Sequence, residues 1–200
     1  MIHKGDTMHS PVKGQTITII QSTADTKGEF LQIGVSMEYG TTLKGVPVHT
    51  HPRQEERFTI KSGWMRVMLN GEERYYGPGE SFTIPPGVSH QWWNARRNEN
   101  LEFISEFRPA MESEKIIEVF SAVCQEGKVK EDGTIPFLQK AVILDKYPDH
   151  FALAGIPLLL QKLLFKLLSP IARLAGYTAS PEYRAPVKKQ DFFKSAHVPV

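Results

Sequence analysis

The chain has 200 residues, 40% of them hydrophobic, which is enough for one sizeable core with some appended structure. Its formal net charge is only +2, and no basic patch interleaved with aromatic residues occurs, so nucleic acid is not an expected partner. A single cysteine, Cys124, excludes an intrachain disulfide and a cysteine-based zinc cluster. We therefore expect a cytoplasmic protein, since the N-terminal residues also lack the apolar run of a secretory signal.

Four segments of different character follow one another along the chain. Residues 1–14 are polar and predict a flexible arm. Residues 15–110 consist of short β-type runs separated by Gly, Pro and Asn, which is typical of a sandwich or barrel. Residues 111–177 have helical periodicity and predict a helical annex, whereas the Pro- and Lys-rich residues 178–200 predict a surface tail.

The barrel segment predicts a mainly β fold built from short strands. Asn70-Gly71 is a strong signal for a two-residue hairpin turn between two of them. The expected strands are Gln15–Ser22, Glu29–Glu38, Arg57–Lys61, Trp64–Leu69, Glu73–Tyr76, Ser81–Ile84, His90–Asn94 and Leu101–Arg108.

Three helices are expected after the barrel. Ser113–Gln125 and Phe137–Asp145 carry apolar residues at helical spacing. Leu158–Leu174 is the most apolar of the three, and Pro170 is expected to bend or break it.

A possible metal site begins with two histidines that are two residues apart. On a strand, His49 and His51 face the same side of the sheet. His90 begins a later strand, and either Glu55 or Glu56 could add a carboxylate. Imidazole and carboxylate together suit one divalent Fe, Mn, Ni, Zn, Co or Cu ion better than Ca or Mg. An isolated His-x-His pair, however, is more often a pair of ordinary strand histidines.

Two stretches of the chain, His49–Gly63 and Gly79–Asn94, resemble the two motifs of the cupin family. The first motif reads His-x-His, three or four residues, Glu, six residues, Gly, and the second reads Gly, five residues, Pro-x-Gly, two residues, His, three residues, Asn. Nine positions agree in type and spacing: His49, His51, Glu56, Gly63, Gly79, Pro85, Gly87, His90 and Asn94. One position departs from the family pattern, since Leu43 stands where a glycine often begins the first motif, with Gly45 nearby.

The resemblance covers about residues 30–108 and implies a cupin jelly-roll β-barrel with an α-helical C-terminal extension. It implies a metal near one mouth of the barrel, with these ligands: His49, His51, Glu56 and His90. It favours Glu56 over Glu55, because Glu56 keeps the six-residue gap to Gly63. Single-barrel cupins pair through strands, so a homodimer is expected.

Strand parity predicts further residues that line a substrate pocket. The expected pocket residues are Phe58, Trp92 and Asn94, with Ile33, Val35 and Met37 as apolar walls. Plain core packing is the alternative for the aromatic residues, and Trp93 is expected to face outward. The remaining histidines have no partners at ligand spacing and are expected at the surface: His3, His9, His150 and His197.

Three functions remain open, because cupins host many chemistries. The first is a metal-dependent dioxygenase, related oxidoreductase or isomerase that acts on a small, mostly apolar oxygenated compound, with Glu56 doubling as a catalytic base if it leaves the metal. The second is a non-catalytic small-molecule binder with a structural or ligand-anchoring metal. The third is an interaction module whose function resides in the helical annex.

The segment Leu158–Leu174 has an unusually wide apolar face. Its polar residues form one narrow stripe, at spacings of four, three and four: Lys162, Lys166, Ser169 and Arg173. We expect the apolar face to pack on the barrel or on a partner subunit, because most such helices are core elements. Contact with a membrane interface is the less expected alternative.

Overall fold

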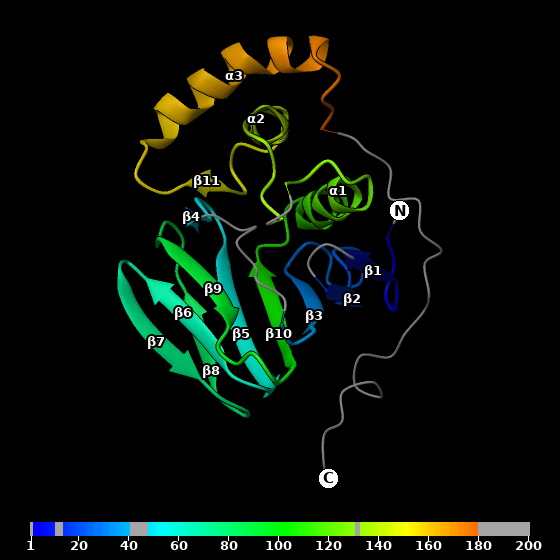
Figure 1. The fold of residues 1–200 in the computed structure, drawn as a ribbon, viewed down its shortest axis with the longest axis vertical. Coiled ribbons are helices and arrows are strands. Elements are labelled where there is room, and N and C mark those ends of the chain that lie inside the picture. Colours follow the sequence, from blue (N-terminus) through cyan, green and yellow to red (C-terminus); the bar gives the residue numbers. More distant parts are fainter. Residues whose placement is uncertain (1, 11–13, 41–47, 131–132, 180–200) are drawn as a thin grey trace.

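The computed structural model describes residues 2–10, 14–40, 48–130 and 133–179 (Figure 1). Three of the sequence-based expectations lie outside the described residues: the turn around Leu43 and Gly45, the surface tail from residue 180 onward, and the surface position of His197.

Two antiparallel sheets make up most of the fold. The six-stranded sheet contains, in spatial order, β1 (Thr7–Ser10), β2 (Gln15–Gln21), β3 (Leu31–Met37), β10 (Leu101–Arg108), β5 (Glu55–Ser62) and β8 (Ser81–Ile84). The five-stranded sheet contains β11 (Ala152–Leu153), β4 (His49–Thr50), β9 (His90–Asn94), β6 (Met65–Leu69) and β7 (Glu72–Tyr76). The chain crosses repeatedly between the sheets, which confirms the expected mainly β jelly-roll barrel.

The barrel core follows from period-two alternation along the strands. On β5, Glu56, Phe58 and Ile60 are buried, while the residues between them are half-buried or exposed, because successive side chains of a strand face opposite sides. Phe58 stacks on Phe82 of the neighbouring strand β8 with ring centroids 4.8 Å apart, and Phe82 stacks on Tyr76 of the other sheet at 4.0 Å. Burying one such phenylalanine contributes about 1.5–3 kcal/mol, so this alternation holds the two sheets together.

Residues 7–10 correct the expectation of a flexible N-terminal arm. They form β1, which pairs with β2 in the register Thr7↔Thr18 to Ser10↔Gln15. Met8 is buried in the barrel core. The polar composition of the arm concealed this edge strand, because Met8 is its one large apolar side chain.

Three helices follow the barrel at the expected positions: α1 (Ser113–Gln125), α2 (Phe137–Lys146) and α3 (Leu158–Leu174). α3 runs through Pro170 without ending there. In Figure 1, α1 and α2 lie over the end of the barrel where β4 and β11 are found, and α3 is the outermost element beyond α2. Among the described residues, no helix is long and apolar enough to cross a membrane.

Gln54 and β11 provide two of the connections between the helical annex and the barrel. Gln54 is buried and its Nε2 donates to Pro109 O at 2.8 Å and to Ser113 Oγ at 2.7 Å, where α1 begins. β11 lies between α2 and α3 in the chain but pairs with β4, so the annex contributes a strand to the five-stranded sheet. The annex therefore bears directly on the end of the barrel that holds the histidines.

Candidate metal centre

The three histidines come together because β4 lies beside β9. His49 is the first residue of β4 and stands directly opposite His90, the first residue of β9. Their ring centroids are 4.1 Å apart. β4 ends at Thr50, so His51 lies just beyond the strand, with its ring centroid 5.1 Å from that of His49. The expectation that both histidines of the His-x-His pair face one site is therefore met.

Glu56 enters the site from β5, on the opposite sheet. Its Oε2 lies 3.4 Å from His51 Nε2 and 3.3 Å from His90 Nε2. Its Oε1 accepts a hydrogen bond of 2.9 Å from Ser105 Oγ on β10. One ligand atom from each of four residues lies within 4.8 Å of the other three, and these residues form the His/Glu cluster: His49, His51, Glu56 and His90.

Backbone carbonyls determine which nitrogen of two histidines faces the cluster. His51 Nδ1 lies 2.6 Å from His150 O, and His90 Nδ1 lies 3.0 Å from Val88 O. A carbonyl oxygen only accepts hydrogen bonds, so each Nδ1 carries the proton and, in a neutral ring, each Nε2 presents a lone pair. This is the arrangement in which histidines serve as metal ligands.

The inner atoms of the cluster lack hydrogen-bond partners. Glu56 Oε2 and His90 Nε2 are buried and have no hydrogen-bond partner among the described residues. Two buried acceptors 3.3 Å apart are unfavourable, since each unsatisfied group costs about 1–3 kcal/mol. A cation between them satisfies both, so the residues present fit a divalent transition metal.

The charge preferences of the site agree with this geometry. Burial alone would raise the pKa of Glu56, but the attraction of His51 and His90 outweighs burial and holds that pKa well below its usual range. Burial alone would lower the pKa of His90, but the Glu56 carboxylate outweighs it and raises that pKa. Glu56 is therefore negatively charged at neutral pH, and its charge attracts positive charge into the cluster.

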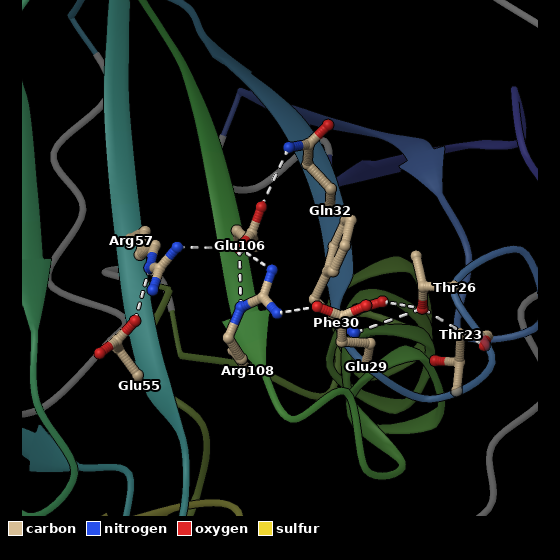
Figure 2. A network of polar contacts seen from close by, with 9 residues as sticks. All are labelled: Thr23, Thr26, Glu29, Phe30, Gln32, Glu55, Arg57, Glu106 and Arg108. Carbon is tan, nitrogen blue, oxygen red and sulfur yellow. Dashed lines mark hydrogen bonds and ion pairs between the residues drawn. The ribbon is translucent and has the colours of Figure 1, made fainter.

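Glu55 points away from the cluster. Figure 2 shows it beside Arg57 on the outer face of the six-stranded sheet, where Arg57 donates to it. Arg57 also reaches Glu106 at 3.8 Å, and Arg108 Nη2 lies 3.0 Å from the same carboxylate. Glu55 thus belongs to an outer network of ion pairs, and the choice of Glu56 for the cluster agrees with the structure.

A cavity of about 180 Å³ opens beside the His/Glu cluster, between the barrel and the annex. Its walls are mainly apolar. The barrel contributes Ile17, Ile33, Val35, Trp92, Phe103 and Phe107, and the annex contributes Ile116, Ile117, Phe120, Ile143, Leu144 and Phe151. Its polar lining residues outside the cluster include Gln54, Ser105, Ser113, Ser121, Lys140 and His150. Cys124 is buried in α1 and also lines the cavity.

The three residues expected to line a substrate pocket occupy different positions relative to the cavity. Trp92 lines the cavity, but Phe58 lies behind it in the core, with ring centroids 6.4 Å apart, and is not among the described lining residues. Asn94 holds the turn after β9, since its Nδ2 donates to Glu99 O and its Oδ1 accepts from Arg96 N.

The positions of the expected apolar wall residues and of Trp93 agree better with the expectation from strand parity. Ile33 and Val35 line the cavity as expected, whereas Met37 is buried in the core. Trp93 faces away from the cavity, and the Arg66 guanidinium lies 4.5 Å from its ring centroid. Parity therefore predicted the faces correctly, but not which residues on a face lie beside the cavity.

His150 corrects the expectation of a surface histidine. It is only 7% exposed, it lines the cavity, and its Nε2 accepts a hydrogen bond from Glu112 N. Burial lowers its pKa, so it is neutral. Its neighbour Phe151 stacks on the His49 ring at 4.4 Å and 14°. No local motif marks these two residues, because their role arises from contacts with β4, about 100 positions earlier.

Comparison with known proteins identifies the family. Residues 36–105 match the model of the cupin domain, and this segment contains the whole His/Glu cluster. No curated protein is similar enough in sequence to count as a match.

Several solved structures share part of the fold. KdgF from Halomonas sp. is 22% identical with a TM-score of 0.44, over 54% of this chain and 91% of that one. A cupin-superfamily sugar phosphate isomerase from Silicibacter pomeroyi is 21% identical with a TM-score of 0.41, over 48% and 60%. The polyketide cyclase RemF from Streptomyces resistomycificus is 20% identical with a TM-score of 0.41, over 54% and 70%. Residues 36–105, which contain both motifs, therefore form a cupin domain.

Proposed function

We propose that the His/Glu cluster binds one divalent transition-metal ion and that the protein is an enzyme acting on a small, mostly apolar oxygenated compound. The observation that carries this proposal is the convergence of four ligand atoms within 4.8 Å of one another beside a cavity with apolar walls. The donor set accepts Fe, Mn, Ni, Zn, Co or Cu, so elemental analysis is needed to choose among them.

The cavity walls support the proposed substrate class. Phe151 stacks on His49, and Phe107 lies 5.5 Å from the His51 ring, so apolar groups surround the ligands themselves. Lys140 is the one lysine or arginine among the described lining residues. A substrate with a phosphate group would leave much of its charge against apolar walls, which is unfavourable. A compound with one or two oxygens and an apolar remainder suits the cavity better.

The residues of the site can bind, orient and take a proton from such a compound. A divalent ion in the cluster would supply Lewis acidity towards a carbonyl or enolate oxygen. Ser105 holds Glu56 Oε1, so Oε2 is the carboxylate atom that faces the histidines. We propose Glu56 as the base that removes a proton next to the substrate carbonyl. Oxygenation and isomerisation both follow from that step.

The test uses the metal-loaded protein with a panel of 1,3-diketone, flavonol and polyketide-type compounds. Oxygen uptake would identify a dioxygenase, and exchange of substrate hydrogen with deuterated solvent without oxygen uptake would identify an isomerase. Glu56→Gln should lower either rate by at least about 10²–10⁴-fold, because it removes the proposed general base and also one of the four proposed metal ligands. Glu55→Gln is the matched control and should leave the rate unchanged.

Two results would count against catalysis. Tight binding of panel compounds without any turnover would favour the non-catalytic binding alternative. Failure of the metal-loaded protein to bind any apolar member of the panel would contradict the proposed substrate class as well.

A further inference from the structure

α3 turns a row of large apolar side chains away from the rest of the protein. These side chains are between 36% and 91% exposed and define the α3 outer face: Leu159, Leu160, Leu163, Leu164, Leu167, Ile171 and Leu174. Figure 1 shows α2 beneath one side of α3, with the other side directed away from the barrel. Contiguous exposed apolar surface of this kind usually marks an interaction site.

The fold does not depend on the α3 outer face. α3 is anchored through its opposite side, where Gln161, Phe165 and Ser169 are buried. The side-chain amide of Gln161 bonds to Leu153 N at 2.8 Å, Leu153 O at 2.9 Å and Ile156 O at 2.7 Å. The sequence-based expectation that the wide apolar face packs on the barrel is therefore not met, because the helix attaches through its more polar side.

Positive charge runs along one edge of the α3 outer face. Lys162, Lys166 and Arg173 are separated by four and seven residues, which places them on one side of a helix. α3 contains no Asp or Glu. Lys162 also pairs with Asp149 at 2.6 Å, at the base of the helix.

This charge distribution distinguishes between possible occupants of the face. A second copy of the chain would bring the same cations and no carboxylate from its own α3 to meet them. Anionic lipid headgroups match both features, because their phosphates attract the cations while the acyl region takes up the leucines. With 17 residues, α3 is too short to span a bilayer, but a helix lying in the interface has no such length requirement.

We propose that the α3 outer face docks the protein on an anionic membrane surface, with α3 in the plane of the interface and the barrel outside it. The proposal is independent of the enzymatic activity proposed above. It has one consequence for that activity. α2, on which α3 packs, lines the cavity through Ile143 and Leu144, so docking brings the cavity within one helix of the lipid.

Vesicle flotation of the full-length protein tests the proposal. The protein should float with vesicles that contain phosphatidylglycerol, much less with vesicles of phosphatidylcholine alone, and less at high salt. The double substitution Leu163→Glu with Leu167→Glu should weaken binding to the anionic vesicles about tenfold or more, because both side chains are more than half exposed and enter the interface. Lys166→Glu should reduce binding to the vesicles that contain phosphatidylglycerol and leave binding to the phosphatidylcholine vesicles unchanged.

The control is Tyr75→Glu, which adds one negative charge, half of that added by the double substitution, at a 54% exposed position on β7, at the other end of the molecule (Figure 1). It should bind vesicles like the unaltered protein. Circular dichroism and melting temperature should be unchanged in all variants, since the substituted side chains are exposed.

Four results would overturn the proposal. The first two are equal flotation with both kinds of vesicle and flotation with neither. The third is unchanged binding of the Leu163→Glu, Leu167→Glu variant to anionic vesicles. The fourth is conversion of a dimer into a monomer by that variant without vesicle binding in either form, which would make the face an interface between copies of the chain.

Discussion

Three of the four residues of the His/Glu cluster are oriented by a hydrogen bond to a group outside the cluster. Ser105 holds Glu56, a carbonyl at position 150 holds His51, and a carbonyl at position 88 holds His90. Such outer contacts determine the tautomer and direction of a ligand before a metal binds. These hydrogen bonds therefore favour the orientations in which Glu56 Oε2, His51 Nε2 and His90 Nε2 face one another.

Removal of one ligand should abolish most metal binding. His90→Ala should lower metal affinity more than about 100-fold, because loss of an outer contact alone costs about 10–100-fold. Glu56→Gln should also bind poorly, since it removes the negative charge. Elemental analysis after dialysis against a limiting metal buffer measures both effects.

The neighbouring carboxylate provides the comparison for this prediction. Glu55→Gln should retain the metal, because Glu55 pairs with Arg57 outside the barrel. If Glu55→Gln loses the metal and Glu56→Gln keeps it, the carboxylate has been assigned to the wrong residue.

At the residue scale, the sequence predicted which four residues form the His/Glu cluster, but only some of the residues that line the cavity. Motif spacing and strand parity distinguish Glu56 from Glu55, because they specify a face of the sheet. The same parity along β10 could have identified Ser105, which lies between the cavity-lining Phe103 and Phe107. Strand parity specifies the face of the sheet on which a side chain lies, but not whether the side chain reaches the cavity. It therefore did not distinguish Trp92, which lines the cavity, from Asn94, which is not among the described lining residues.

At the element scale, the annex supports β4, the strand that carries His49. β4 has only two residues and lies between β9 and β11, which pairs with it through Ala152↔Thr50 and Leu153↔His49. The sequence predicted all three helices but not β11, because a two-residue strand has no periodicity to detect. Contacts across such distances in the chain leave no local pattern.

Phe151 offers a test of this support. Phe151→Ala should lower metal affinity about tenfold, the lower end of the range for an outer contact, because the ring stacked on His49 is lost. Titration with a chromophoric metal competitor measures the change. Phe120→Ala is a suitable comparison, since Phe120 also lines the cavity and lies 6.1 Å from Phe151. Equal losses in the two variants would show a general effect of cavity packing instead.

Replacing each of two motif glycines by alanine should lower the free energy of unfolding by different amounts. Gly63 has a φ of +74°, and a Cβ there would lie 2.2 Å from Asn100 O. Gly79 has a φ of +84°, but a Cβ there would meet nothing within 4 Å. Gly79→Ala should therefore cost only the left-handed backbone strain, about 1–2 kcal/mol. Gly63→Ala should cost more than about 3 kcal/mol, because the clash with backbone adds to that strain.

Urea unfolding of both variants measures these free energies. The difference between the two alanine variants isolates the close approach of Asn100, since the backbone strain is common to both. Similar unfolding midpoints for the two would contradict the packing described around Gly63.

At the scale of the whole molecule, the packing of the helices and strands was harder to predict from the sequence than which helices and strands form. The helical pattern of α3 showed that an apolar face exists, but not which side attaches to the protein. The hydrogen bonds of Gln161 fix the attached side of α3, and these depend on backbone groups of β11 and of the loop that follows it. The homodimer likewise stays a prediction. Light scattering should give twice the mass of one chain, and a single-chain mass at working concentration would contradict it.

Metal binding should stabilise the whole fold. The ligands come from the β4 region, β5 and β9, and so from both sheets, and the unfolded chain does not hold them together. An ion that binds only the folded state stabilises it by about 2.7 kcal/mol at a free concentration 100 times its dissociation constant. For a chain of this length, that corresponds to a rise in melting temperature of about 5–11 °C. Differential scanning calorimetry with and without a chelator measures the rise, and His90→Ala should abolish it. A rise that persists in His90→Ala would mean that the stabilising ion binds elsewhere on the protein.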